Sequence, residues 1–204
     1  MKYLGAAAVA LAAMAMSAPA ANAEAAAGHF QVTVGVSGVL PDVKGSPIPA
    51  DIDDQYVPTL GIEYFFTDNI SAELLCCTAR HSVTAANGAV DLGHVNHFPP
   101  TVTLKYHFTN LGAFEPYVGA GVNYTHFFNS DAPSGLRVRY GDSFGGALQA
   151  GFDYHLNDHW AINADVRKIW ISTDVKIDGL APSTVRDSVD VNPLVTTVGV
   201  AYRF

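Results

Sequence analysis

Serine and histidine are the side chains of this 204-residue chain that could supply a nucleophile and a base. Hydrolysis by nucleophilic attack requires the two groups to lie side by side. Ser71, Ser143, His107 and His155 occupy positions of one parity in predicted strands, so they face the same interior. No nucleophile-elbow motif surrounds either serine, and such interior histidines more often complete a hydrogen-bond network. We therefore expect that the protein is not an enzyme.

Histidine and cysteine could also bind a metal or form a disulfide. His81, His94 and His97 fall in one long connection, but their spacing is irregular and no cysteine or carboxylate completes a ligand set. Cys76 and Cys77 are adjacent, so in a strand their side chains point to opposite faces and we interpret both as small packing residues. The sequence therefore predicts no metal site and no cofactor.

Charge and the N-terminus narrow the class of protein. The chain carries 11 Lys and Arg against 19 Asp and Glu, a net charge of −8, without a basic run, so we expect no nucleic-acid partner. Lys2, an apolar run and the small-residue site Ala21–Ala23 have the layout of a secretory signal peptide. We predict a signal peptide over residues 1–23 and one domain over residues 24–204. No later stretch approaches the 18 apolar residues of a membrane-spanning helix.

The elements that must position these residues follow a period of two, which is typical of strands. Eight segments show it: Phe30–Leu40, Tyr56–Thr67, Ile70–Thr78, Phe98–Phe108, Phe114–Phe128, Ser143–Leu156, Trp160–Trp170 and Leu194–Phe204. Short links follow the second, fourth and sixth segments, and long connections follow the first, third, fifth and seventh. This pattern predicts an all-β fold, an eight-stranded antiparallel up-and-down transmembrane β-barrel.

Alternation alone also fits a soluble barrel such as a lipocalin, whose apolar residues lie inside. Aromatic residues, however, gather on the apolar face at both ends of the predicted strands, as in the girdles of a membrane barrel. The polar face carries charges of both signs, which can pair across a narrow interior. We therefore predict that the apolar face meets lipid and that a charge belt fills the lumen. Its members are Glu63, Glu73, Lys105, Glu115, Asp153, Asp165, Arg167 and Arg203.

Five segments together resemble the OmpW family of Gram-negative outer-membrane proteins. They are "DNISAELLCCTARH", "HFPPTVTLKYHF", "FEPYVGAGVNYTHFF", "GFDYHLNDHWAINADVRKIWISTDV" and the terminal "VGVAYRF". The resemblance implies an eight-stranded barrel in the cell outer membrane, with a narrow, partly apolar channel linked to uptake of small hydrophobic molecules. The ending also resembles the signature that the outer-membrane assembly machinery recognises, so Tyr202 and Phe204 are the expected assembly signal and that machinery an expected partner.

An eight-stranded barrel holds its own side chains or one small ligand. Apolar residues of inward parity near the long connections therefore predict an apolar funnel that opens outwards above the charge belt. They are Val57, Leu75, Phe127, Ile169 and Val191. We expect small hydrophobic solutes to enter it and, as the family resemblance suggests, to leave sideways into the membrane. Alternatively, these residues only pack the loops onto the barrel mouth.

A second hypothesis is a non-transporting surface protein whose loops bind partners or stabilise the outer leaflet. The connection Pro41–Gln55 holds four aspartates against Lys44, so divalent cations or neighbouring lipopolysaccharide could matter there. Outer-membrane lipid and lipopolysaccharide are the expected surroundings under either hypothesis.

Overall fold

The computed structural model describes residues 26–44, 50–77, 79–85, 90–131, 137–178 and 185–204. The predicted signal peptide, residues 1–23, lies outside the described residues. Among the described residues, no helix has the length and apolar character needed to cross a membrane.

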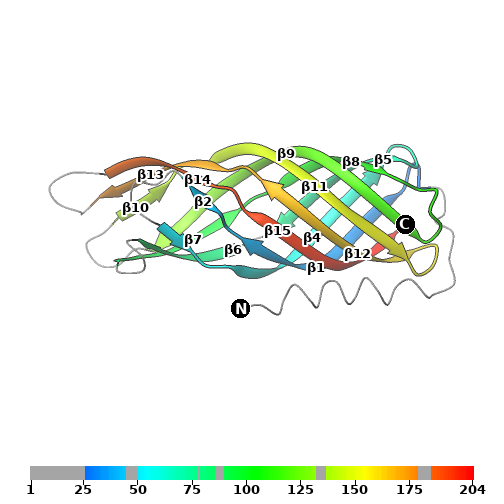
Figure 1. Cartoon of the computed structure of the whole chain (residues 1–204), viewed down its shortest axis with the longest axis horizontal. Coiled ribbons are helices and arrows are strands. Elements are labelled where there is room, and N and C mark those ends of the chain that lie inside the picture. The colour runs from blue at the N-terminus through cyan, green and yellow to red at the C-terminus, as the bar shows by residue number, and fades with distance from the viewer. Residues whose placement is uncertain (1–25, 45–49, 78, 86–89, 132–136, 179–184) are drawn as a thin grey trace.

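Eight antiparallel strands form a closed barrel, as the sequence predicts (Figure 1). They are β1 (Phe30–Leu40), β4 (Gln55–Phe65), β5 (Ile70–Cys77), β8 (Thr101–His107), β9 (Phe114–Asp131), β11 (Ser143–His155), β12 (Trp160–Ile169) and β15 (Leu194–Arg203). Each strand pairs with its chain neighbour in the barrel, and β1 pairs with β15 to close it. The final residue extends the pairing of β1 with β15, because the Phe204 N–H donates to the Phe30 carbonyl at 2.8 Å.

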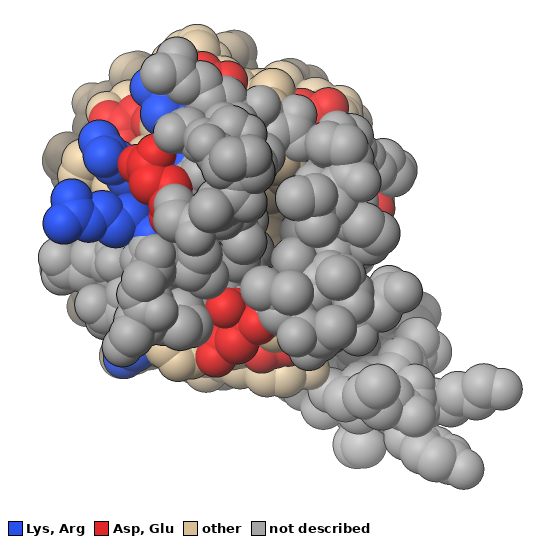
Figure 2. All heavy atoms as spheres, turned by 90° about the vertical axis from the view of Figure 1, so that its left-hand side faces the viewer, with Lys and Arg blue, Asp and Glu red and all other residues tan. Residues whose placement is uncertain are grey.

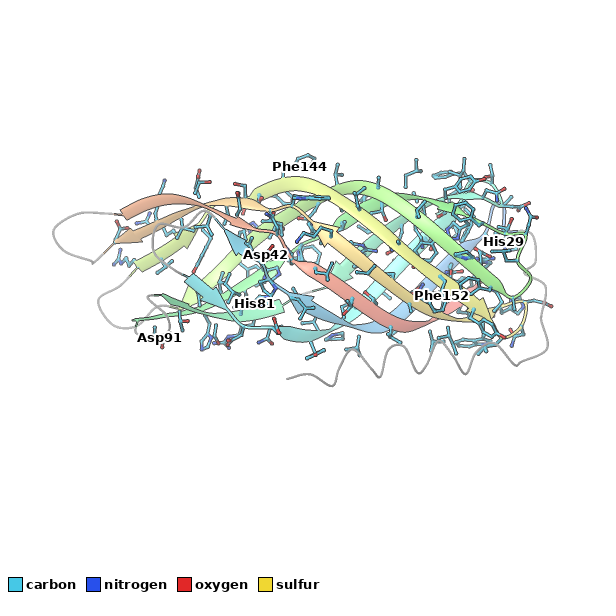
Figure 3. The ribbon with its side chains drawn as sticks, viewed as in Figure 1. His29, Asp42, His81, Asp91, Phe144 and Phe152 are labelled. Carbon is cyan, nitrogen blue, oxygen red and sulfur yellow. The ribbon has the colours of Figure 1, made fainter. Side chains whose placement is uncertain are left out.

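Burial alternates along the strands in the direction expected for a membrane barrel. On β8, the side chains of Thr103 and Lys105 are buried, whereas Leu104 between them is 58% exposed. Phe144, 72% exposed, projects from the outer surface near the long-loop end (Figure 3). The large apolar side chains therefore face lipid and the polar ones face the bore, which excludes the lipocalin-like arrangement.

The long connections contain strands that the sequence analysis treats as loops. They are β2 (Val43–Lys44), β3 (Ala50–Ile52), β6 (Ala79–Ala85), β7 (Val90–Phe98), β10 (Arg137–Tyr140), β13 (Ser172–Asp178) and β14 (Val185–Val191). Together they extend the wall beyond the barrel, at the left of Figure 1. The predicted strand Phe98–Phe108 is divided, because Phe98 ends β7 and Pro99-Pro100 offers no N–H donor to a ladder.

The extension has two parts. β7, β6 and β3 continue the wall from β9, whereas β10, β13, β14 and β2 form a separate four-stranded sheet. In the described residues no ladder joins β9 to β10, so a seam separates the two parts. The last β9–β11 pair below this seam is Thr125 with Ser143.

Glycine allows two barrel strands to approach closely at Gly121 on β9. A Cβ atom there would lie 1.9 Å from the Val102 carbonyl oxygen of β8 and 2.6 Å from the Thr103 Cα. Both are backbone atoms of a paired strand, so neither can move without breaking the ladder. Gly61 on β4 differs, because its Cβ would meet nothing closer than the Thr33 Cβ at 3.5 Å.

We predict that Gly121→Ala lowers the free energy of unfolding by about 1–3 kcal/mol, the usual effect of overpacking. Gly61→Ala is the matched control and leaves it within about 0.5 kcal/mol of the wild-type value, because the added methyl makes an ordinary contact. Urea unfolding in lipid vesicles, followed by tryptophan fluorescence, measures both. Equal stability of the two variants would contradict the close approach of β8 and β9.

Candidate functional site

The structure brings all eight predicted belt residues into the bore. The side chains of Glu63, Glu73, Lys105, Glu115, Asp153, Asp165, Arg167 and Arg203 are each at most 8% exposed. Their inward direction follows from strand parity, because each occupies an alternate position on its strand. Pairing across the bore compensates the cost of removing these charges from water.

Lys105 lies at the centre of the belt. Its Nζ is 2.7 Å from Glu63 Oε2 and 3.1 Å from Glu73 Oε2, and it lies 3.7 Å from the centroid of the Tyr117 ring. Arg167 reaches Glu73 from the opposite side, with Nη2 2.8 Å from Oε1. Because β12 and β5 stand opposite one another in the strand order, the Arg167 side chain crosses the bore.

A second group of bonds occupies the end of the bore near the short turns. Arg203 Nη2 lies 3.3 Å from Glu115 Oε1, and His155 Nε2 lies 2.9 Å from Glu115 Oε2. His107 lies between the two groups, with Nδ1 2.7 Å from Glu115 Oε1 and Nε2 2.8 Å from Glu63 Oε1, the carboxylate that also contacts Lys105. The two histidines thus lie in an ion-pair and hydrogen-bond network.

Uncharged polar residues complete the network, although they are not among the eight predicted belt residues. Gln31 and Asn163 donate to the Asp153 carboxylate at 2.9 and 2.7 Å, and Gln149 donates to Glu73 at 3.2 Å. Their inward parity is visible in the sequence, but parity does not say which polar residues meet.

His107, Glu115 and Asp153 offer three ligand atoms within 4.8 Å of one another. Glu115 already contacts Arg203 and His155, and Asp153 already accepts two side-chain hydrogen bonds. Because these oxygen atoms are engaged with protein donors, the cluster is part of the belt rather than an assembled cation site.

An apolar layer follows directly above the belt, towards the long-loop end. It consists of Val39, Val57, Ala147, Ile169, Ile171 and Val195, with Phe127 packed against it. Its six core members are 2–6% exposed, so side chains fill the bore at this level.

The predicted funnel residues fall partly into this layer. Val57, Ile169 and Phe127 belong to it. Leu75 is buried on β5 outside the cluster, and Val191 is half-buried at the end of β14. Val39, Ala147 and Ile171 were missed, although inward parity is the signal that could have found them, and Val195 has the inward parity in the sequence but was not assigned to the funnel.

Aromatic rings lie above the apolar layer. His81 and His97 stack with ring centroids 5.0 Å apart, and His97 lies 6.0 Å from Phe127. His81 Nδ1 is 2.9 Å from the Asp53 carbonyl oxygen, and Figure 3 shows His81 in the extension. His94 is exposed and its Nδ1 contacts Ser82 Oγ at 3.1 Å, so the three histidines of this connection do not converge.

Burial shifts the titration of the stacked pair. It lowers the pKa of His97 to about 3, with a further contribution from His81, and it also lowers the pKa of His81. Both rings are therefore neutral at pH 7. Neutral rings carry no mutual repulsion, which suits their stacking beside an apolar layer.

We predict that Lys105→Met lowers the free energy of unfolding by about 3–5 kcal/mol, because it leaves Glu63 and Glu73 in the bore without their shared partner. Arg139→Met is the control. It breaks the exposed Arg139–Asp178 pair, at 3.1 Å, and changes stability by roughly 0–1 kcal/mol. Urea titration in lipid vesicles measures both variants, and similar losses for the two would refute the central place of Lys105.

A second prediction concerns acidic pH. The folded pKa of His97 lies below the unfolded value near 6.5, so as pH falls through 6.5 the unfolded segment binds a proton that the folded one does not. Stability that is fully present above pH 6.5 is therefore lost as the pH falls towards about 3. At pH 5, amides of β6 and β7 will exchange faster in the wild type than in His97→Phe. The difference between the two proteins should shrink at pH 7.5, and a difference independent of pH would contradict the assignment.

Comparison with known proteins identifies the family of this barrel. The family model described as "OmpW family" matches residues 24–204. Outer membrane protein W of Vibrio cholerae is 36% identical over 196 residues, covering 87% of this chain and 89% of the relative. A protein of Pseudomonas aeruginosa named "Dibenzothiophene metabolism operon protein PahQ" is 29% identical, covering 79% of each chain.

Among solved structures, the outer membrane protein OprG of Pseudomonas aeruginosa superposes with a TM-score of 0.80 at 32% identity, covering 87% of this chain and 96% of that one. The chain belongs to the OmpW family and is an outer-membrane β-barrel of a Gram-negative bacterium.

Proposed function

We propose that the protein takes small hydrophobic molecules into the apolar layer of its bore and passes them into the outer membrane, without enzymatic chemistry. The observation that carries the proposal is the position of the apolar layer directly above a paired charge belt.

The free-energy change for moving an apolar solute inwards is favourable within the apolar layer and unfavourable within the charge belt. An apolar molecule gains about 25 cal/mol for each Å² removed from water, so entry into the layer is favourable. Passage through the belt would require separating buried ion pairs with no replacement partner, which is strongly unfavourable. A solute that has entered the layer therefore leaves through the wall or returns.

A lateral path would begin at Phe127. This residue packs against the apolar layer and its ring lies 5.7 Å from the ring of Tyr140 on β10. The two residues face one another across the seam between β9 and β10, where no backbone ladder is described. Ring contacts can open by side-chain rotation, whereas a ladder would have to be broken.

The name of the relative PahQ supports an apolar molecule as the solute. Its name ties it to dibenzothiophene metabolism, and dibenzothiophene is an apolar aromatic molecule. The agreement concerns the kind of molecule and does not identify the solute of this protein.

We predict that Val57→Thr combined with Val195→Thr reduces the protein-dependent uptake of naphthalene into lipid vesicles. Each change keeps the volume and adds a buried hydroxyl, so roughly 1 kcal/mol per site, or about 2 kcal/mol for the pair, gives about a thirtyfold loss. Val36→Thr with Val198→Thr is the matched control, because these paired valines face lipid and are 56% and 51% exposed. Uptake that is unchanged in the folded Val57/Val195 variant would overturn the proposal.

The alternative is a non-transporting surface protein. The end-on view shows Lys and Arg gathered at one edge of the extension beside Asp and Glu (Figure 2). In the extension, Arg137 and Arg139 on β10 and Lys176 on β13 are exposed. Such a charged rim suits contact with the outer leaflet. Electrical silence in planar bilayers together with no uptake of naphthalene would favour this role.

A further inference from the structure

Arg167 carries two buried donors that have no partner. Its side chain is 0% exposed, and in the described part of the chain Nε and Nη1 form no hydrogen bond. Only Nη2 is engaged, with Glu73 at 2.8 Å, while Asp165 lies 3.9 Å away. A buried N–H without an acceptor costs about 1–3 kcal/mol, so this arrangement needs an explanation.

The position of Arg167 supplies one. Its ladder partner on β15 is Val195, and the next inward residue on β12 is Ile169. Both belong to the apolar layer. Arg167 is therefore the belt residue of β12 that adjoins the apolar layer, and we take its guanidinium as the polar floor of that layer.

We propose that Arg167 receives the acceptor oxygen of a ligand whose body occupies the apolar layer. The inference rests on the proposed function and specifies its substrate class, which is a small apolar molecule with one neutral acceptor group at its end, such as a ketone. The oxygen accepts from Nε or Nη1, and the hydrocarbon chain replaces apolar side chains that now fill the bore.

The charge of the belt selects a neutral acceptor. Five carboxylates, from Glu63, Glu73, Glu115, Asp153 and Asp165, lie in the bore with three strong bases, Lys105, Arg167 and Arg203. Asp165 is close to Arg167 and its Oδ1 has no hydrogen-bond partner among the described residues. A ligand carboxylate would meet this negative charge at close range, whereas a carbonyl oxygen brings no net charge.

For a ligand to reach Nε and Nη1 of Arg167, the side chains that seal these two donors from solvent must move. Both nitrogen atoms are sealed from solvent, so no water-sized space adjoins them. Val195, the ladder partner of Arg167, and Ile169, the next inward residue on β12, have aliphatic side chains, and side-chain rotation is fast in comparison with backbone rearrangement. The gain of a hydrogen bond then adds to the gain from burial of the ligand chain, and the two together favour the ligand over the collapsed layer.

The first experiment uses the wild-type barrel in lipid nanodiscs. Side-chain ¹⁵Nε–¹Hε spectra are recorded with 2-octanone, with n-octane and with octanoate, and the Arg167 signal is assigned by its absence in Arg167→Lys. We expect 2-octanone to shift this signal and n-octane to leave it in place. A shift with octanoate but not with 2-octanone would overturn the neutral-acceptor assignment.

The second experiment compares uptake into vesicles, corrected for protein-free vesicles. The wild type should prefer 2-octanone over n-octane by about three- to tenfold, the range expected for one hydrogen bond. Arg167→Lys keeps a cation beside Glu73 but removes the forked donors, and the preference should fall to about one. Arg203→Lys is the matched belt control, because the Nε of Arg203 already donates to Gln31 at 3.1 Å, and there the preference should persist.

The outcomes separate this inference from the proposed function. If neither solute is taken up by the wild type, the proposed function fails. If both are taken up without preference and the Arg167 signal does not move, the proposed function stands and the assignment of Arg167 is overturned.

Discussion

Closure of the backbone ladder is the constraint on which the rest of this structure depends. Lipid offers no partner for an N–H or a carbonyl group, so the first and last barrel strands must pair, as they do from Gln31–Arg203 to Leu40–Leu194. Closure with eight strands leaves a bore only wide enough for side chains. Since side chains alternate, half of each strand must enter that bore. The composition of this half then determines the chemistry of the interior.

The same parity supplies both the belt and the apolar layer. Along β12 the inward residues change from Asp165 and Arg167 to Ile169, and along β5 from Glu73 to Leu75. No separate domain is needed to build the boundary. Because the belt side chains are buried, attraction between paired charges is stronger there than at a surface, and apolar side chains cover the belt on the side of the long loops.

The sequence predicts the strands and their faces well, because a period of two is a local property. It does not predict partners across the bore. Arg167 and Glu73 are 94 residues apart and meet because the strand order sets β12 opposite β5. Ala147 has the inward parity, but a side chain as small as that of alanine does not by itself indicate a place in an apolar layer. The strand β13, "STDVKID", belongs to none of the eight predicted segments, although Thr173, Val175 and Ile177 alternate with polar residues along it.

The boundary at Arg167 makes the two halves of the bore interdependent. The belt fills the bore with paired charges, and the apolar layer covers those pairs on the side of the long loops. Under the proposed function, a solute that moves inwards gains free energy only as far as the guanidinium, where further movement would break the Glu73 contact. An electrostatic contact would then set the floor of the binding region, and the proposed exit lies in the wall above it.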